Sequence, residues 1–339
     1  MSGAGLPADL LTVLTSLYLG GSVPASGAVA AALGKRKPVA QPPKVVGTTG
    51  AWKGTPIATV TSGKDVTLLV KGGKGWTVAG GWWPSLAVVR PPMKVMKVLA
   101  IGSDARNPQP VTKCRGDAIH IIGVDPARGV GGIVGIPRDS WVPLAGGGSA
   151  KINAALVFGG VSGMVHSVEH VSGVAIDGYV ITGFKGFRGM VSSLGGIVVS
   201  YPRALRSNDG YQILRAGTNR LDAKHALGFA RERKHLPNGD FGRSANQGLL
   251  IKAGVAMAQR AGIAGLAGLL SKMGPWLQTN LSVEEVLNLS ASLYLSPAAK
   301  IPNKVVPGDV GTRDGQSVVL LGGGARSVFA DMRDGHLRA

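Results

Sequence analysis

Three strand-like runs that follow closely on one another constrain the fold of this 339-residue chain more than any other feature. They are Val95–Gly102, Asp117–Asp125 and Gly132–Ile136, each a short apolar run bounded by turn residues. Further along, strand-like and helix-like runs alternate, as in Asp177–Gly183 followed by Phe184–Leu194. This alternation predicts an α/β fold, an α-β-α sandwich with a central mixed sheet and helices on both faces.

Carboxylates and guanidinium groups stand side by side where these runs begin or end. The pairs are Asp104 with Arg106, Arg115 with Asp117, and Arg138 with Asp139. Loops at strand ends are where α/β sheets bind ligands. Arginine forks bind phosphate oxygens, and carboxylates hold divalent metals. The six residues therefore predict a phosphoryl-transfer site.

A second stretch rich in cations joins two predicted helices. Asp222 is a suitable N-cap for the first helix, and Arg231 and Arg233 crowd its C-terminal end. Arg243 and Gln247 are four residues apart, so they share one face at the start of the next helix, where amide dipoles attract anions. A basic cluster at one helix end, facing the start of another helix, predicts a pocket of pyrophosphate size.

The overall charge predicts an anionic partner. The chain carries 37 Lys and Arg against 18 Asp and Glu, a formal net charge of +19. Nucleic acid, an anionic membrane surface and a phosphorylated polymer all fit such a charge. The single cysteine, Cys114, excludes an intrachain disulfide and a cysteine-based zinc cluster. Gly146–Lys151 lacks the spacing of a Walker A loop, which argues against ordinary nucleotide-dependent chemistry.

The N-terminal part is predicted to be organised separately from the rest. We divide the chain into an N-terminal segment with a linker (1–56), a small β-rich accessory segment (57–93) and a catalytic domain (94–335). Leu10–Leu19 is apolar enough for a signal or membrane anchor, but Lys35–Lys37 follows it, where the positive-inside rule would not place cations in an external protein. A short packed helix is the alternative. Pro38–Pro56 is typical of a linker.

Several conspicuous residues have a structural and a functional interpretation. Trp76, Trp82 and Trp83 could stack on sugars or pack a small docked sheet, and we favour packing. His120 lies inside an apolar run without an evident carboxylate partner, so we expect a hydrogen-bonded core histidine rather than a general base. The glycines of Gly72–Gly75 predict a hairpin turn rather than a phosphate-binding loop.

Six motifs, in order, resemble those of the LytR–CpsA–Psr family of bacterial cell-wall phosphotransferases. They are GSDAR (Gly102–Arg106), RGDA (Arg115–Ala118), IPRD (Ile136–Asp139), KINAA (Lys151–Ala155), ARERK (Ala230–Lys234) and GDFGR (Gly239–Arg243) with Gln247. The resemblance extends over about residues 94–335. One departure is Gly116, which stands where many members carry serine. The other is the absence of a clear membrane anchor.

The resemblance implies a function. Family members transfer a glycopolymer from a polyprenyl-pyrophosphate carrier to peptidoglycan, forming a phosphodiester on the outer face of the cytoplasmic membrane. By resemblance, Asp104 and Asp117 hold Mg²⁺, for which Mn²⁺ could substitute. The implied catalytic residues are Asp104, Arg115, Asp117, Arg138 and Asp139. The implied pyrophosphate-binding residues are Arg106, Arg115, Arg138, Lys151, Asn153, Arg231, Arg233, Arg243 and Gln247. Asp104, Asp117 and Asp139 all remain candidates for the base.

A polyprenyl tail would also need a long apolar pocket between sheet and helices. The runs ALVFGGV (155–161) and GLLIKAGVAM (248–257) could line it or be ordinary core. Two other functions remain open. One is a non-catalytic regulator that binds anions or nucleic acid, although the acidic residues among the arginines would repel a nucleic-acid backbone. The other is an isoprenoid pyrophosphatase that uses water as the acceptor.

Overall fold

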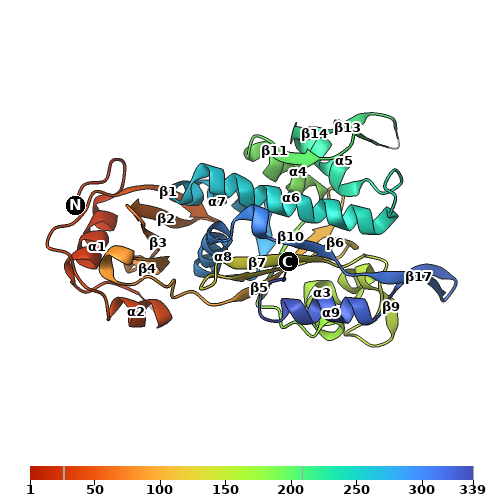
Figure 1. The fold of residues 1–339 in the computed structure, drawn as a ribbon, viewed down its shortest axis with the longest axis horizontal. Helices are drawn as coiled ribbons and strands as arrows, with labels where there is room; N and C mark the ends of the chain where they lie inside the picture. The colour runs from red at the N-terminus through yellow and green to blue at the C-terminus, as the bar shows by residue number, and fades with distance from the viewer. Residues whose placement is uncertain (26, 208, 339) are drawn as a thin grey trace.

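A six-stranded mixed sheet forms the centre of the molecule (Figure 1). The computed structural model describes residues 1–25, 27–207 and 209–338. The strand order is β15-β10-β5-β6-β7-β16. Their bounds are β5 Met96–Ser103, β6 Gly116–Asp125, β7 Val130–Gly135, β10 Gly178–Thr182, β15 Gln278–Thr279 and β16 Asn303–Val305. β10 runs parallel to β5 and β16 parallel to β7, while the β5–β6, β6–β7 and β10–β15 pairs are antiparallel. The predicted mixed sheet is thus confirmed.

The antiparallel register of β5, β6 and β7 brings the end of β5, the start of β6 and the end of β7 together at one end of the sheet. Ser103 at the end of β5 pairs with Gly116 at the start of β6, and His120 of β6 pairs with Gly135 at the end of β7. Because neighbouring antiparallel strands run in opposite directions, the loop that joins β5 to β6 and the segment after β7 lie next to each other. This end of the sheet carries the acidic and basic pairs predicted from the sequence.

Helices cover both faces of the sheet, as predicted. On one face lie α3 (Ala155–Ser172) and α9 (Gly323–Met332); on the other lie α6 (Gly239–Ala261), α7 (Leu266–Met273) and α8 (Val283–Leu295) (Figure 1). Side chains alternate along each strand. In β5, Leu99 and Ile101 join the core under α3 and α9, whereas Val98 joins the core under α7 and α8. The short strands β8 (Trp141–Pro143) and β9 (Ser149–Lys151) lead into α3.

Helix boundaries follow local signals. Ser282 and Glu285 form a capping box at the start of α8, and Asp222 caps the helix Ala223–Arg231 by accepting the His225 backbone N–H. Gly262 adopts a positive φ of 75°, and α6 ends immediately before it. A 3-10 turn, Ile263–Gly265, then leads into α7.

A smaller subdomain inserted after β10 carries its own core. It contains α4 (Phe184–Ser193), β11 (Ile197–Tyr201), β12 (Leu205–Arg206), β13 (Gln212–Leu214), β14 (Gly217–Leu221) and α5 (Ala223–Arg231). β11 pairs with β14 outside the central sheet. Phe229 is fully buried here and meets Tyr201 edge to face. Near the C-terminus, β17 (Gly308–Arg313) and β18 (Gln316–Leu321) form a hairpin.

The N-terminal part contains a second, four-stranded antiparallel sheet. Its strands are β1 Val46–Trp52, β2 Thr55–Ser62, β3 Asp65–Gly72 and β4 Gly75–Trp82. The predicted linker over 38–56 is therefore wrong from Val46 onward. β1 is an edge strand of glycine, threonine and alanine, so it lacks the apolar alternation by which a strand is recognised in sequence. The predicted hairpin turn at Gly72–Gly75 is confirmed.

Both faces of this second sheet are packed. α1 (Ala8–Leu19) and α2 (Gly27–Leu33) cover one face, and α1 buries Leu10, Leu14 and Leu17 completely. Trp76 and Trp83 belong to that same core, while Trp82 packs toward α7 and α8, so the packing interpretation of the tryptophans is confirmed. Among the described residues no single helix has the length and apolar composition to cross a bilayer. The helix pair Gly239–Ala261 and Ile263–Trp276 has the required length and composition when the two helices are taken together, but the pair is bent by 106°.

Candidate functional site

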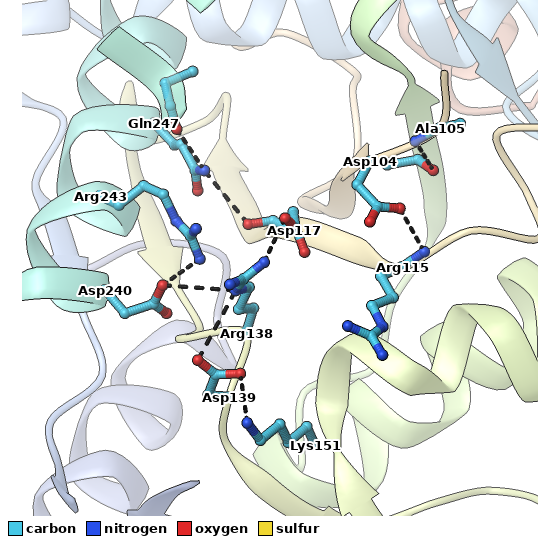
Figure 2. Close-up of polar contacts among 12 residues, drawn as sticks. Asp104, Ala105, Arg115, Asp117, Arg138, Asp139, Lys151, Asp240, Arg243 and Gln247 are labelled. Carbon is cyan, nitrogen blue, oxygen red and sulfur yellow. Dashed lines mark hydrogen bonds and ion pairs between the residues drawn. The ribbon is translucent and has the colours of Figure 1, made fainter. Parts of the chain in front are cut away.

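Arg138 is the centre of an ion-pair network at this end of the central sheet (Figure 2). Its Nη1 donates to Asp117 Oδ2 at 2.6 Å, and its Nε lies 3.9 Å from Asp139 and 3.8 Å from Asp240. Burial lowers the pKa of Arg138, but the hydrogen bond and charge of Asp117, together with the other two carboxylates, more than offset this and hold the pKa above its usual value. The guanidinium is thus a fixed positive charge.

The first turn of α6 supplies a second ion pair. Arg243 pairs with Asp240 three residues earlier, and both side chains are largely buried. Burial raises the pKa of Asp240 even though Arg243 beside it acts in the opposite direction. Asp240 was not predicted as a site residue. The available signal was its place in the GDFGR motif, where three-residue spacing puts it on the same helix face as Arg243.

The loop between β5 and β6 is closed by reciprocal hydrogen bonds. The Arg115 backbone N–H donates to Asp104 Oδ1 at 2.8 Å, and the Asp104 N–H donates to the Arg115 carbonyl at 2.9 Å. The Arg115 side chain is exposed, so it is accessible to a ligand. Arg106, in the same loop, is also exposed and forms no ion pair within the described residues.

Asp104 and Asp117 fit a divalent cation. Across the described part of the chain, the buried Oδ1 of Asp117 has no hydrogen-bond partner, although Oδ2 is held by Arg138. In Figure 2, Asp117 lies between Asp104 and the Arg138 network. Within the described residues, no group of three or more histidine, cysteine, aspartate or glutamate side chains is arranged to hold a metal ion by itself. Two carboxylates completed by water and phosphate oxygens are the donor set that Mg²⁺ prefers.

Lys151 and Asn153 support the Arg138 loop. Lys151 Nζ lies 3.2 Å from Asp139 Oδ1, so Asp139 contacts two cations. Asn153 is only 4% exposed, and its backbone N–H donates to the Arg138 carbonyl at 3.1 Å. The structure therefore brings Lys151 into the network and places Asn153 behind it. The predicted contact of Asn153 with pyrophosphate remains a prediction.

The remaining predicted residues approach from α5 and α6. The Arg231 guanidinium lies 4.8 Å from the ring centre of Phe184, and Arg233 is exposed just beyond α5. Gln247 Nε2 donates to the Ala230 carbonyl at 3.0 Å and to the Asp117 carbonyl at 3.4 Å. Gln247 thus connects the end of α5 to β6. Its predicted contact with pyrophosphate remains a prediction.

His120 is a core histidine, as predicted. It is 1% exposed, and its Nε2 lies 3.0 Å from the Ser244 carbonyl. Burial lowers its pKa to about 4, so the imidazole is neutral at physiological pH. A neutral ring held against a backbone carbonyl donates its Nε2 proton there, as expected of a hydrogen-bonded core histidine.

A cavity of about 590 Å³ opens beside this network and extends between the central sheet and the helices α4, α6, α7 and α8. Its charged end is lined by Asp117, Arg231 and Arg243. Beyond them the wall is apolar, with Leu250, Val255, Leu270, Leu289 and Leu293 among its residues. The predicted lining run 248–257 does line the cavity. The run 155–161 does not, because α3 lies on the opposite face of the sheet.

Comparison with known proteins identifies relatives of this chain. Residues 88–328 match the family described as LytR_cpsA_psr. A Bacillus anthracis protein named polyisoprenyl-teichoic acid–peptidoglycan teichoic acid transferase TagU is 30% identical over 216 residues, 63% of this chain and 69% of that protein. The Bacillus subtilis transferase of the same kind, TagV, is 32% identical over 186 residues, 52% of this chain and 48% of its own.

Solved structures show the same fold. The crystal structure of B. subtilis TagV superposes with a TM-score of 0.61 at 27% identity, covering 71% of this chain and 98% of TagV. The crystal structure of B. subtilis TagU gives a TM-score of 0.55 at 25% identity, covering 73% of this chain and 98% of TagU. The α/β architecture with a central mixed sheet is common to all three.

Proposed function

This chain belongs to the LytR–CpsA–Psr family, and we propose that it transfers a glycopolymer from a polyprenyl-pyrophosphate carrier to peptidoglycan. Relatives at about 30% identity are named polyisoprenyl-teichoic acid–peptidoglycan teichoic acid transferases, which supports this reaction class. The proposal fits a location near the membrane in the cell envelope, where carrier and peptidoglycan meet. The net charge of +19 suits an anionic membrane surface there.

One observation carries the proposal: a single cavity has a cationic mouth and an apolar interior. Arg231, Arg233 and Arg243 line the mouth, and leucines such as Leu270 and Leu289 line the interior. A polyprenyl-pyrophosphate donor has the same two-part character, an anionic headgroup on a long hydrocarbon tail. Guanidinium forks suit phosphate oxygens, and apolar walls favour hydrocarbon. Neither a nucleic acid nor a soluble nucleotide would use the apolar interior.

The proposed bond changes occur at the glycan-bearing phosphorus. A peptidoglycan hydroxyl oxygen forms a bond to that phosphorus, the bridging P–O bond of the pyrophosphate breaks, and polyprenyl phosphate leaves with the electron pair. Arg115, Arg138 and Arg243 would stabilise the developing negative charge, so the protein acts chiefly through positioning and electrostatics. The hydroxyl proton passes to Asp104 or Asp117. Asp139 contacts both Arg138 and Lys151 and serves as a positioning residue.

Mg²⁺ is part of the proposal. Asp104 and Asp117 would hold it, consistent with the unpartnered Oδ1 of Asp117, and Mn²⁺ would be an acceptable substitute. When bound, the cation neutralises charge on the pyrophosphate oxygens. The arginines around Asp117 would supply the rest of the positive charge that the pyrophosphate requires.

The test is transfer of labelled glycan from a lipid-linked donor to peptidoglycan by the purified full chain. Arg115→Ala and Arg231→Ala are each expected to abolish transfer while the circular dichroism spectrum stays unchanged. Arg260→Ala is the matched control, because Arg260 is exposed at the far end of α6. Undiminished transfer in both site variants would refute the assignment. Release of free phosphate without glycan transfer would instead indicate an isoprenoid pyrophosphatase.

A further inference from the structure

A residue of the N-terminal sheet lines the lipid-sized cavity. Trp52, the last residue of β1, is 3% exposed and forms part of the cavity wall. It belongs to one buried cluster with Leu266 and Leu270 of α7 and Val286 of α8. Trp52 lies outside residues 88–328, the part of the chain that matches the family. This wall is therefore supplied by the N-terminal sheet, outside the part of the chain that the family shares.

Trp52 stands at the end of the cavity opposite the arginines. The cavity follows α6 from Arg243 and Gln247 to Met257 and Ala258. At 1.5 Å per residue, that stretch of helix is about 22 Å long. α7 continues from the far end of α6, and Figure 1 shows β1 beside α7 there. The indole thus lies where a tail entering from the charged mouth would end.

A glycine keeps the middle of the cavity clear. Gly254 lies in α6 and lines the cavity, and a Cβ added to it would meet no atom within 4 Å. Glycine inside a helix is less favourable than alanine, so local helix stability does not account for it. A side chain at this position would instead project into the space that a tail would occupy.

We propose that Trp52 and Gly254 set the length of isoprenoid tail that the cavity encloses, an inference that rests on the proposed function. Trp52 is the end wall, and Gly254 keeps the passage to that wall open. Isoprenoid units up to the wall bury apolar surface and add to affinity. Units beyond it add nothing, because they remain outside the apolar enclosure. Tail selectivity then depends on residues outside the catalytic motifs.

The experiment measures affinity of the full chain with Mg²⁺ for geranyl, farnesyl, geranylgeranyl and longer prenyl pyrophosphates by calorimetry. For the wild-type chain, each enclosed unit should tighten binding by at least about tenfold until the affinity reaches a plateau. Trp52→Ala should move the plateau to longer tails. Gly254→Leu should move it to shorter ones, and it keeps the test informative if Trp52→Ala does not fold.

Each variant has a matched control. Trp76→Ala removes an equally buried tryptophan from the same sheet that faces α1 and does not line the cavity. Gly268→Leu places a side chain in open space on α7, also outside the lining residues. If wild type binds but the plateau of each variant matches that of its control, the inference fails and the proposed function stands. Failure of the wild-type chain to bind any prenyl pyrophosphate would overturn both.

Discussion

The two ends of the cavity are held together in opposite ways. At the charged end, each contact joins two particular atoms, as Arg138 Nη1 does with Asp117 Oδ2. At the apolar end, side chains from β1, α7 and α8 share one cluster in which each residue touches several others. Ion pairs are directional and few, whereas apolar contacts are non-directional and many.

This difference predicts two kinds of sensitivity. Removing one member of a buried ion pair leaves its partner charged and unpaired, so the loss is large and abrupt. Removing one apolar side chain leaves the rest of the cluster in place, so the loss is graded. Single substitutions at the charged mouth should therefore abolish catalysis. Single substitutions along the apolar interior should each lower the affinity for the lipid donor by a smaller amount.

Arg138→Ala should have the largest effect. It removes the partner of Asp117 and the neighbour of Asp139 and Asp240. We expect transfer to fall by about a thousandfold and the free energy of unfolding to fall by about 2 kcal/mol. Stopped assays of glycan transfer and denaturant titrations measure the two. Arg128→Ala is the control, since its side chain is 63% exposed; an equal loss in both variants would contradict the special role of Arg138.

Removing the divalent metal should have the next largest effect. In the proposed site, the charge on the pyrophosphate oxygens near Asp104 and Asp117 would be only partly neutralised without Mg²⁺. Chelation is expected to lower transfer by about a hundredfold, with recovery on addition of Mg²⁺ or Mn²⁺. Asp117→Asn should weaken Mg²⁺ binding measured by calorimetry. Full activity of chelated protein would remove the metal from the proposal.

His120, which lines the cavity between its two ends, should make the fold sensitive to acid. Its pKa is about 4 in the folded protein against an ordinary 6.5, so the unfolded chain binds the additional proton. The free energy of unfolding therefore keeps its full value above pH 6.5 and decreases as the pH falls toward 4. At pH 5 the decrease is about 2 kcal/mol. Chemical denaturation at pH 7 and pH 5 measures this. A His120→Asn variant should show a correspondingly smaller difference between the two pH values.

Leu270→Ala tests the apolar end and should have the smallest effect on function. Leu270 is 4% exposed and lines the cavity. We expect prenyl-pyrophosphate affinity to fall by about tenfold, with turnover of bound donor almost unchanged. Leu14→Ala, in the core under α1, removes an equally buried leucine without touching the cavity. A tenfold loss of affinity in that control would break the distinction between the two ends.

Much of the fold could be predicted from local sequence signals. The runs that became β5, β6 and β7 are apolar and bounded by turn residues, and the SVEE capping box marks the start of α8. β1 could not be predicted, because its glycine and threonine residues carry no apolar alternation. The end of α6 at Gly262 is not visible in the sequence either, because the apolar pattern continues past Gly262 although the helical backbone stops there.

The candidate site was predictable as a set of residues but not as a set of contacts. The motifs identified the arginines and aspartates at this end of the sheet, since charged pairs at strand ends are visible in sequence. They did not identify Asp240 as the partner of Arg243, nor Gln247 as a link between α5 and β6. The first contact is local, and its sequence signal is the three-residue spacing within GDFGR. The second joins Gln247 to Asp117, which lies 130 residues away in the chain, so only the packing of the helices on the sheet could reveal it.

The sequence by itself determined the charges, the three successive strand-like runs and the family that the motifs resemble, because these depend on residue type and local spacing. Only the tertiary structure decided the order of the strands in the sheet, which carboxylate faces which guanidinium, which face of the sheet holds the cavity, and that Trp52 lines it. The physical reason is that apolar packing is non-directional. A leucine-rich helix fits either face of a sheet from its sequence, and the choice is made only when all the elements pack together.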